Sequence, residues 1–260
     1  MELKQAVAIV TGSSSGIGAA IATQLAAKGC RVAINYNRNS QGAQAVAQAC
    51  QDMGAEPLVW RADVAVDSDC RALVDATLKR FGRLDILVNN AGTTKFCGHQ
   101  NLAGLSTEDF LNIYAVNTVG PFLMTRAAEQ ALRQQPVAHI VNMASIAAIT
   151  GVGSSIAYAA SKGALVTMTM SLARVLGPQI RVNAICPGFV AGEWLKNGLG
   201  ESIYTAMQKH YMEISPLKNT ATPETVAQTV LALVGGADWT TGETIIVDGG
   251  AHLHTAPMRR

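Results

Sequence analysis

Charged and aromatic residues are scarce in this chain, and their scarcity excludes several classes of protein. Charged residues make up 15% of the 260 positions, aromatic residues 5%, and the net charge is only +2. A balance so close to neutral gives no reason to expect a nucleic acid or an anionic membrane as partner. No apolar run is long enough to span a bilayer, and the first predicted strand begins too early to leave room for a signal peptide.

Cysteine is also sparse. The chain has five cysteines, and they are scattered, with no pair at the spacing of metal ligands: Cys30, Cys50, Cys70, Cys97 and Cys186. Reduced thiols in a cytoplasmic protein are the simplest interpretation. His252 and His254 near the C-terminus are expected to be surface residues, and we predict no metal site.

Hydrophobic residues, by contrast, make up 49% of the chain and fall into short strand-like runs that alternate with helical stretches. Strands are predicted over 6–10, 31–36, 56–60, 86–89, 137–143, 180–185 and 244–247, and helices over 17–28, 42–53, 67–81, 107–132, 155–176 and 223–234. This alternation predicts a single α/β domain over residues 1–260, with a doubly wound, seven-stranded parallel sheet and helices on both faces. Asp67 or Ser68 is expected to cap the third helix, and Gly82 to end it.

A glycine- and serine-rich segment links the first predicted strand to the first helix. Its glycines, Gly12, Gly16 and Gly18, have the spacing Gly-x-x-x-Gly-x-Gly. Free backbone N–H groups at the start of a helix, together with the helix dipole, favour a phosphate at such a turn. A glycine-rich turn alone is weak evidence, because it can also serve only to bring a helix close to a sheet.

Tyr158 and Lys162 form the most informative pair in the second half of the chain. Four residues apart on a helix, their side chains share one face. A phenol titrates near pH 10 in water, and a neighbouring ammonium is expected to lower the pKa of Tyr158. The pair can move a proton but not a hydride, so its chemistry requires a cofactor.

Taken together, the motifs resemble those of the short-chain dehydrogenase/reductase family in its simple one-domain form, and the resemblance covers nearly the whole chain. It rests on Thr11 to Gly18, Asp63-Val64, Asn89-Asn90-Ala91-Gly92, Asn117, Ser145, Tyr158 with Lys162, Pro187-Gly188 and Val247-Asp248-Gly249-Gly250. The resemblance implies a Rossmann fold and a catalytic set of Asn117, Ser145, Tyr158 and Lys162. Tyr158 would be the general acid in reduction and the base in oxidation. Ser145 would hold the substrate oxygen, and Asn117 would mark a local helix irregularity and a water that extends a proton relay from Lys162.

The resemblance also implies a dinucleotide site. Its expected residues are Gly12, Ser14, Ser15, Gly16, Ile17, Gly18, Asn37, Arg38, Asp63, Val64, Asn89, Ala91, Gly92, Tyr158, Lys162, Pro187, Gly188 and Val190. The end of the second predicted strand lacks the acidic residue that usually accepts the ribose 2′-hydroxyl of NAD, and Arg38 could bind a 2′-phosphate instead. NADP(H) is therefore the predicted cofactor, with NAD(H) as the alternative.

Substrate choice is expected to depend on a lid near residues 189–215. The residues expected to line the site are Ile146, Ser155, Phe189 and Trp194, with Lys95, Phe96 and His99 as further candidates. We predict a small-molecule carbonyl or alcohol as substrate, with 3-oxoacyl thioester reductases and sugar dehydrogenases as the most similar groups. By analogy with the family, a homotetramer is predicted, with the C-terminal tail 251–260 against another subunit. A non-catalytic dinucleotide sensor or scaffold and a sugar-nucleotide epimerase remain the alternatives.

Overall fold

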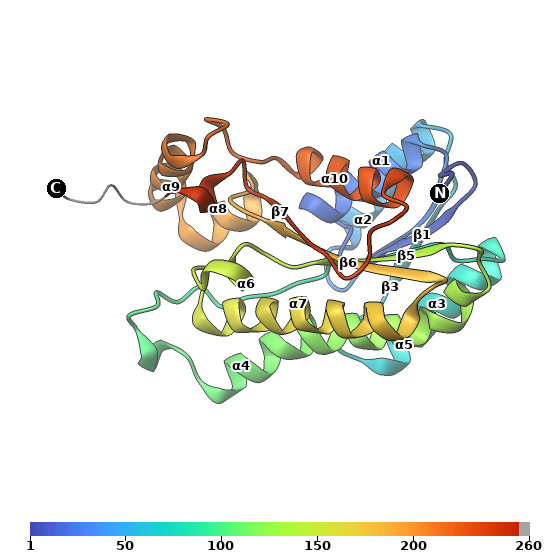
Figure 1. Ribbon diagram of the computed structural model, residues 1–260, viewed down its shortest axis with the longest axis horizontal. Coiled ribbons are helices and arrows are strands. Elements are labelled where there is room, and N and C mark those ends of the chain that lie inside the picture. Colours follow the sequence, from blue (N-terminus) through green and yellow to red (C-terminus); the bar gives the residue numbers. More distant parts are fainter. Residues whose placement is uncertain (255–260) are drawn as a thin grey trace.

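A parallel sheet of seven strands runs through the centre of the computed structural model, which describes residues 1–254 (Figure 1). Its order is β3-β2-β1-β4-β5-β6-β7, and every neighbouring pair is parallel. The strands are β1 (Val7–Val10), β2 (Arg31–Tyr36), β3 (Pro57–Arg61), β4 (Ile86–Asn89), β5 (Ala138–Met143), β6 (Ile180–Pro187) and β7 (Thr244–Val247). Since the order reverses between β1 and β4, the predicted doubly wound α/β fold is confirmed.

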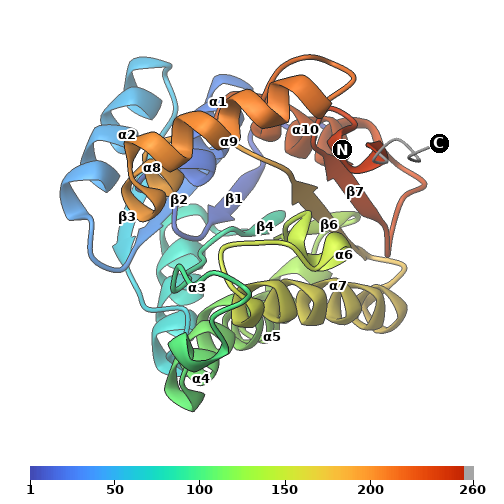
Figure 2. The ribbon, with the colours of Figure 1, turned by 90° about the vertical axis from the view of Figure 1, so that its left-hand side faces the viewer.

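Helices cover both faces of this sheet. On one face lie α1 (Gly16–Ala27), α2 (Ser40–Asp52) and α10 (Pro223–Gly236), and on the other lie α3 (Asp67–Phe81), α4 (Thr107–Tyr114), α5 (Gly120–Arg133) and α7 (Ile156–Leu176) (Figures 1 and 2). Each crossover from one strand to the next parallel strand carries at least one of these helices. The long connection after β6 carries α10 together with two further helices.

The core consists of two apolar layers, one on each side of the sheet. Along β1, Val7 and Ile9 pack into the layer with α3 and α5, whereas Ala8 and Val10 pack into the layer with α1, α2 and α10. All four side chains are fully buried. Fully burying a valine or isoleucine side chain is worth about 1.5–3 kcal/mol, so both layers hold the strand in place and fix where it ends.

The start of α3 differs from the sequence prediction. Neither Asp67 nor Ser68 caps this helix: Val66 is the N-cap, in an extended conformation and without a side-chain cap. Asp67 instead lies in the first turn, where its carboxylate pairs with Arg71 and Arg126. The prediction was wrong because these two arginines, one of them from α5, compete for the carboxylate that would otherwise cap the helix. Gly82 does end the helix, in the left-handed conformation with φ of 76°.

The helix predicted over 107–132 is not continuous. A π-helical turn, η2 (Ala115–Val119), separates α4 from α5 and contains Asn117. Wider turns of this kind occur mostly as single insertions and are frequent at functional sites. The irregularity expected around Asn117 is therefore present in the fold.

The segment after β6 contains two helices that the sequence prediction did not specify. They are α8 (Glu193–Leu199) and α9 (Glu201–Ile214), and no residue of either helix is buried. A short helix, α6 (Ala147–Thr150), also follows β5. Short or exposed helices lack the long apolar stripe that makes a helix recognisable in a sequence.

Two further observations concern residues 1–254. Within this part of the chain, no helix combines the length and the apolar character needed to cross a membrane. All five cysteines are free thiols, and all except Cys97 are buried.

The C-terminal tail was predicted to contact another subunit. Most of this tail, residues 255–260, lies outside the described residues.

Candidate active site

The carboxyl ends of the strands lie on one side of the molecule, toward the left in Figure 1 and facing the viewer in Figure 2. The glycine-rich segment follows β1, the Asn89–Gly92 segment follows β4, and Ser145 follows β5. Ligands of doubly wound sheets bind at this edge, close to the point where the strand order reverses. The fold thus brings the predicted motifs to one place.

The glycine-rich segment needs its glycines for two different reasons. Gly12 has a φ of 61°, and a Cβ there would come within 2.8 Å of the Ala91 Cα. A Cβ on Gly18 would come within 2.4 Å of the Asn90 Nδ2 atom. Gly16 also has a positive φ, of 55°, but open space lies where its Cβ would be. The first and third glycines therefore allow close packing, whereas Gly16 leaves room for a ligand.

Three polar residues hold this segment in shape. The Gly12 N–H donates to Asn35 Oδ1 at 3.0 Å, and Asn90 Nδ2 donates to the carbonyl oxygens of Thr11 and Gly12 at 2.9 and 3.1 Å. The Thr11 hydroxyl accepts hydrogen bonds from the Asn90 and Ala91 N–H groups. Asn35 and Asn90 were not among the predicted site residues. A buried asparagine inside the apolar strand β2 is the signal that could have identified Asn35.

The start of α1 is suited to an anion. Its N-cap, Ser15, makes no side-chain hydrogen bond to the helix, and the first turn contains no acidic residue. The N–H groups of this turn are therefore free of side-chain partners, and together with the open space at Gly16 they form a cradle for phosphate groups. The arrangement of these residues fits a dinucleotide.

The ends of β2 and β3 place Asn37, Arg38 and Asp63 next to this cradle. Asn37 Nδ2 donates to Asp63 Oδ2 at 2.9 Å, while Asp63 Oδ1 accepts from the Ala65 N–H in the following turn. The Asp63 side chain thus serves as a turn cap and also fixes Asn37. Arg38 is exposed, and its side chain makes no hydrogen bond or ion pair with the rest of residues 1–254.

The segment after β4 contains one residue that joins two strands and another that borders Lys162. Asn89 is buried and donates to Asn142 Oδ1 at 2.9 Å, which joins β4 to β5. Gly92 lies beside Asn117 and Lys162, because a Cβ there would be 3.5 Å from Asn117 Oδ1 and 3.6 Å from Lys162 Nζ. Val64 is buried against Gly120 and so faces the core.

Lys162 is enclosed at the centre of the site. Only 4% of its surface is exposed, and its ammonium donates to the Met143 carbonyl oxygen at 2.7 Å. Burial disfavours the charged form and lowers the pKa of Lys162 to about 8. At neutral pH the ammonium is thus retained but held close to its titration point.

The pKa of Tyr158 is shifted in the direction opposite to the sequence expectation. Burial raises the pKa of Tyr158 to about 12, and interaction with Ser145 opposes this rise only in part. The Lys162 Nζ atom lies over the tyrosine ring, 5.7 Å from its centroid, and is directed at the Met143 carbonyl rather than at the phenol oxygen. The loss of hydration therefore outweighs the field of the ammonium, and the phenol is protonated at neutral pH.

Asn117 connects two segments of the site through its side chain. Its Oδ1 atom accepts from the Thr93 N–H at 2.8 Å, and its Nδ2 atom donates to the Thr93 carbonyl oxygen at 2.9 Å and the Ser161 hydroxyl at 3.0 Å. The loop after β4 is thus tied to α7 next to Lys162. This pairing requires the amide to face inward from the widened turn η2.

The end of β6 approaches the site from the other side. Gly188 lies so close to Asp248 that a Cβ would be 2.5 Å from the Asp248 Cβ. Pro187 is the last residue of β6, and its carbonyl oxygen accepts from the Ile146 N–H at 2.9 Å. Val190 forms a bridge with Ala221. These contacts fix the path of the chain directly after the sheet.

The four residues expected to contact the substrate differ in their surroundings. Ser155 is buried and caps α7 by accepting from the Tyr158 N–H, so its hydroxyl is already engaged. Phe189 is buried against Tyr204 and Tyr211, and Ile146 is also buried. Trp194 differs, because it is 49% exposed and its ring centroid lies 6.1 Å from that of Tyr158. Of the four, Trp194 is the one that is exposed next to Tyr158.

Residues 1–254 contain no group of three or more histidine, cysteine, aspartate or glutamate side chains that could hold a metal ion. His252 instead pairs with Asp248, one turn earlier, at 2.9 Å.

Comparison with known proteins agrees with this geometry. Residues 12–252 match the family described as Enoyl-(Acyl carrier protein) reductase. The chain is 42% identical over 247 residues to a ketoacyl reductase assigned to the granaticin polyketide synthase of Streptomyces violaceoruber, covering 95% of this chain and 96% of that protein. It is 36% identical over 247 residues to the 3-oxoacyl-[acyl-carrier-protein] reductase of Synechocystis, covering 94% and 96%.

A solved structure is also closely similar. A crystal structure from Burkholderia xenovorans, described as that of a short-chain dehydrogenase/reductase, superposes with a TM-score of 0.89 at 39% identity. The similarity covers 96% of this chain and 99% of that one. It therefore includes the sheet, both helical layers and the segment after β6.

Proposed function

This chain belongs to the short-chain dehydrogenase/reductase family and is an NAD(P)-dependent oxidoreductase acting on carbonyl and alcohol groups. We propose that it reduces a 3-oxoacyl thioester, that NADP(H) is its preferred cofactor, and that Tyr158 is its general acid. The observation that carries the proposal is the grouping of Tyr158, Lys162 and Ser145 at the carboxyl edge of the sheet, next to the phosphate cradle at α1.

The dinucleotide, when bound, supplies the hydride. The free N–H groups at the start of α1 would hold its phosphates, and Asp63 would contact its adenine. The small residues Ala91 and Gly92 would leave room for the nucleotide, while Val190 would contact the carboxamide by its backbone. Lys162 would hydrogen-bond the nicotinamide ribose once its ammonium turns from the Met143 carbonyl oxygen.

Tyr158 would donate the proton to the substrate oxygen. Because burial raises its pKa to about 12, the phenol is fully protonated at neutral pH, which is the state that a general acid needs. Ser145 would hold the same oxygen by its hydroxyl and stabilise the negative charge that develops there. Asn117 would position Lys162 by fixing the Thr93 loop against Ser161 on α7.

The first test is NADPH consumption with an acetoacetyl thioester by the parent and by Tyr158→Phe. General acid catalysis contributes about 10²–10⁴-fold, so the variant should lose turnover by that factor. NADPH binding, measured by fluorescence titration, should be retained, since the phosphate cradle is unchanged. Full activity in Tyr158→Phe would refute the assigned acid, and NADPH binding without turnover of any carbonyl would favour a sensor.

The preference for NADP(H) is supported by charge at the end of β2. Arg38 is exposed and free to bind a 2′-phosphate, and no acidic residue occurs between Asn35 and Ser40. We expect Arg38→Glu to raise KM for NADPH about tenfold or more, because a hydrogen bond to a charged group is lost and a repulsion is added. KM for NADH should change little.

Arg174→Glu provides the matched control for this test. Arg174 is also exposed, but it lies near the C-terminal end of α7, away from the carboxyl edge of the sheet. The Arg174→Glu substitution makes the same change in net charge as Arg38→Glu but leaves the proposed site unchanged. An equal effect of both substitutions, or none from Arg38→Glu, would refute the role of Arg38.

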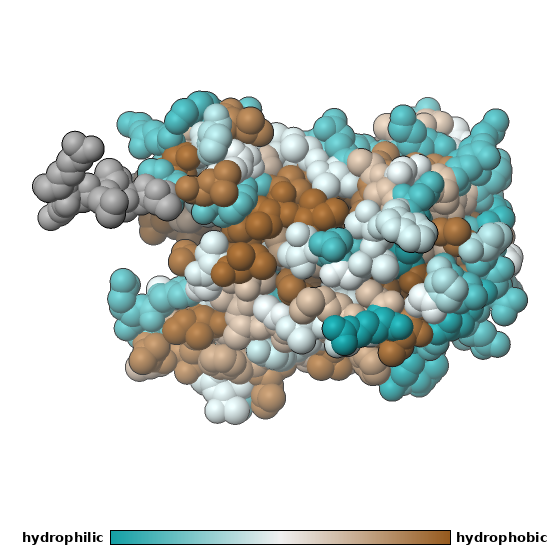
Figure 3. All heavy atoms as spheres, in the orientation of Figure 1, coloured by the Kyte–Doolittle hydropathy of each residue, from teal (hydrophilic) through white to brown (hydrophobic). Residues whose placement is uncertain are grey.

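Two further proposals concern the whole molecule. We propose a homotetramer in which α4, α5 and α7 form an interface, because large apolar side chains are exposed on all three helices, among them Leu111, Phe122 and Met170. Brown, hydrophobic spheres accordingly lie along the lower side of Figure 3, over these helices. A cytoplasmic location is supported by five cysteines that are all free thiols.

A further inference from the structure

Two aromatic rings from distant parts of the chain, those of Trp194 and Phe96, meet next to Tyr158. The Trp194 ring, on α8, lies 6.1 Å from Tyr158 and 5.5 Å from Phe96, measured between centroids. Both pairs are tilted, at 43° and 52°, as is common for aromatic contacts. Trp194 nevertheless remains half exposed, so part of this side chain is open to a ligand next to the tyrosine.

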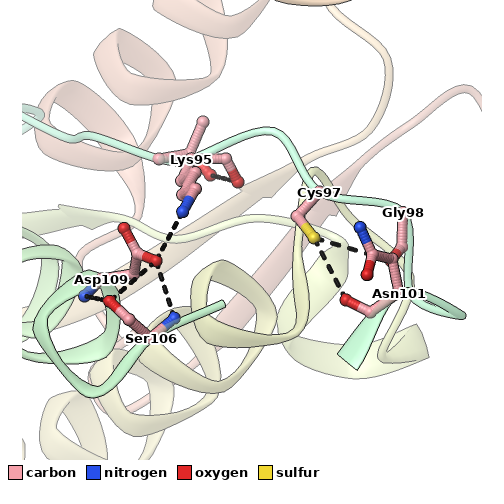
Figure 4. A network of polar contacts seen from close by, with 7 residues as sticks. Lys95, Cys97, Gly98, Asn101, Ser106 and Asp109 are labelled. Atoms are coloured by element: carbon pink, nitrogen blue, oxygen red, sulfur yellow. Dashed lines mark hydrogen bonds and ion pairs between the residues drawn. The ribbon is translucent and has the colours of Figure 1, made fainter. Parts of the chain in front are cut away.

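Phe96 is held in place from both sides by the loop between β4 and α4. On one side, Lys95 pairs with Asp109 at 2.7 Å, and Asp109 forms the capping box of α4 with Ser106 (Figure 4). On the other side, the Cys97 N–H donates to the Ser154 carbonyl oxygen at 2.9 Å. With both neighbours anchored, Phe96 offers a fixed surface to α8.

The contact between Phe96 and α8 depends on a glycine. A Cβ on Gly198 would lie 1.9 Å from Phe96 Cε2 and 2.1 Å from Cζ, so the phenyl ring rests directly on the helix backbone. Gly198 and Trp194 are four residues apart and share one face of α8. Phe96 therefore supports the same helical face that carries Trp194 over Tyr158.

The aromatic cluster has no free lysine beside it in the sequence. The two lysines that adjoin it are both paired, Lys95 with Asp109 and Lys196 with Glu201 at 2.9 Å. An anionic group on the substrate would thus find no unpaired lysine next to the cluster among the described residues, and the exposed Glu193 beside Trp194 would repel it. In Figure 3 the molecule is indented on the left, between the α8–α9 segment and the β4–α4 loop, with hydrophobic residues on both sides.

We propose that Trp194, supported by Phe96, determines substrate specificity by stacking on an uncharged, ring-bearing ketone whose carbonyl reaches Tyr158. This inference rests on the proposed carbonyl reductase function and narrows its substrate class. In the reaction, the hydride of NADPH adds to the carbonyl carbon and the Tyr158 proton to the oxygen. The ketone becomes a secondary alcohol while NADPH becomes NADP⁺.

The test compares 2-tetralone, a bicyclic ketone, with the N-acetylcysteamine thioester of acetoacetate, which has no ring. Trp194→Leu should raise KM for 2-tetralone about fivefold, as expected for the loss of one aromatic contact, and leave kcat nearly unchanged. KM for the thioester should change less than about twofold, because that substrate gains little from the ring. Phe96→Leu should act in the same direction, and Trp194→Phe should retain most of the preference.

Trp239→Leu is the matched control, since Trp239 is fully exposed on the loop before β7, at the opposite end of the sheet from the site. Equal losses on both substrates in Trp194→Leu, or no loss on either, would overturn the proposal. So would a parent enzyme that reduces the thioester but not 2-tetralone. If the parent reduces neither substrate, the proposed function itself fails, and the two failures are thus distinguishable.

Discussion

Tyr158 and Lys162 illustrate how one pair of residues can be recognised in the sequence while its chemistry depends on the surroundings. Their spacing of four places both on one face of α7, where Lys162 is buried and Tyr158 is partly buried. Burial raises the pKa of the phenol to about 12 and lowers that of the ammonium to about 8, so the two pKa values move apart. At neutral pH the phenol is therefore protonated, whereas the ammonium lies close to its titration point.

The lowered pKa of Lys162 leads to a pH dependence. The ammonium is present below pH about 8 and lost above it, whereas Tyr158 stays protonated to about 12. We therefore expect kcat for reduction by NADPH to be level near neutral pH and to fall as the pH rises through about 8. The measurement is a pH–rate profile at saturating substrates, and the limb should be absent in Lys162→Met. A profile of the parent that stays flat to pH about 10 would contradict the assignment.

Among the secondary-structure elements, α8 depends for its position on aromatic contacts outside its own segment, with Tyr158 and above all with Phe96. It has seven residues, too few to be stable alone, and none of them is buried. Phe96 resting on Gly198 provides the contact that fixes α8 over the site. The position of the Asn117 side chain likewise depends on its surroundings, because the residue is buried where the helix widens at η2.

Gly198→Ala tests this contact. Alanine favours a helix by about 1 kcal/mol over glycine, so α8 should stay folded, but the new methyl group must displace either the Phe96 ring or the helix. We expect a higher KM for carbonyl substrates, unchanged NADPH binding and a red-shifted tryptophan emission as Trp194 becomes more exposed.

Two further variants control this experiment. Gly235→Ala, on α10, adds a methyl group at an ordinary 3.6 Å from Leu3 Cδ1 and should change none of these quantities. Phe96→Ala alone removes the same contact and should raise KM and shift the emission in the same direction as Gly198→Ala. An unchanged KM and emission in Gly198→Ala would show that Phe96 does not hold α8.

For the whole molecule, the exposed apolar side chains on α4, α5 and α7 lie on one face of the sheet (Figure 1). Contiguous apolar surface of this kind usually marks an interface. We expect sedimentation velocity at micromolar concentration to give a tetramer for the parent. Phe122→Glu combined with Met170→Glu should shift it to smaller species, because two charges are then placed in the interface. Met53→Glu, an exposed position beyond α2 on the other face, should leave the tetramer intact, and a monomeric parent would contradict the proposal.

Local spacing alone determined much of this protein. Short apolar runs separated by helical stretches are sufficient to specify parallel crossovers, so the doubly wound sheet and most strand limits were predictable. The turn at Gly12–Gly18 and the Tyr158–Lys162 spacing depend on neighbours within one or two helical turns, and they too could be read directly.

Tertiary packing decided the features that join distant segments. Asn35 and Asn90 reach the glycine-rich segment across 23 and 78 positions, and Phe96 reaches Gly198 from another crossover. The upward shift of the Tyr158 pKa likewise depends on what surrounds the phenol rather than on Lys162 alone. Such contacts and burial arise only when the layers pack, because no local pattern encodes which remote side chain will occupy a given space.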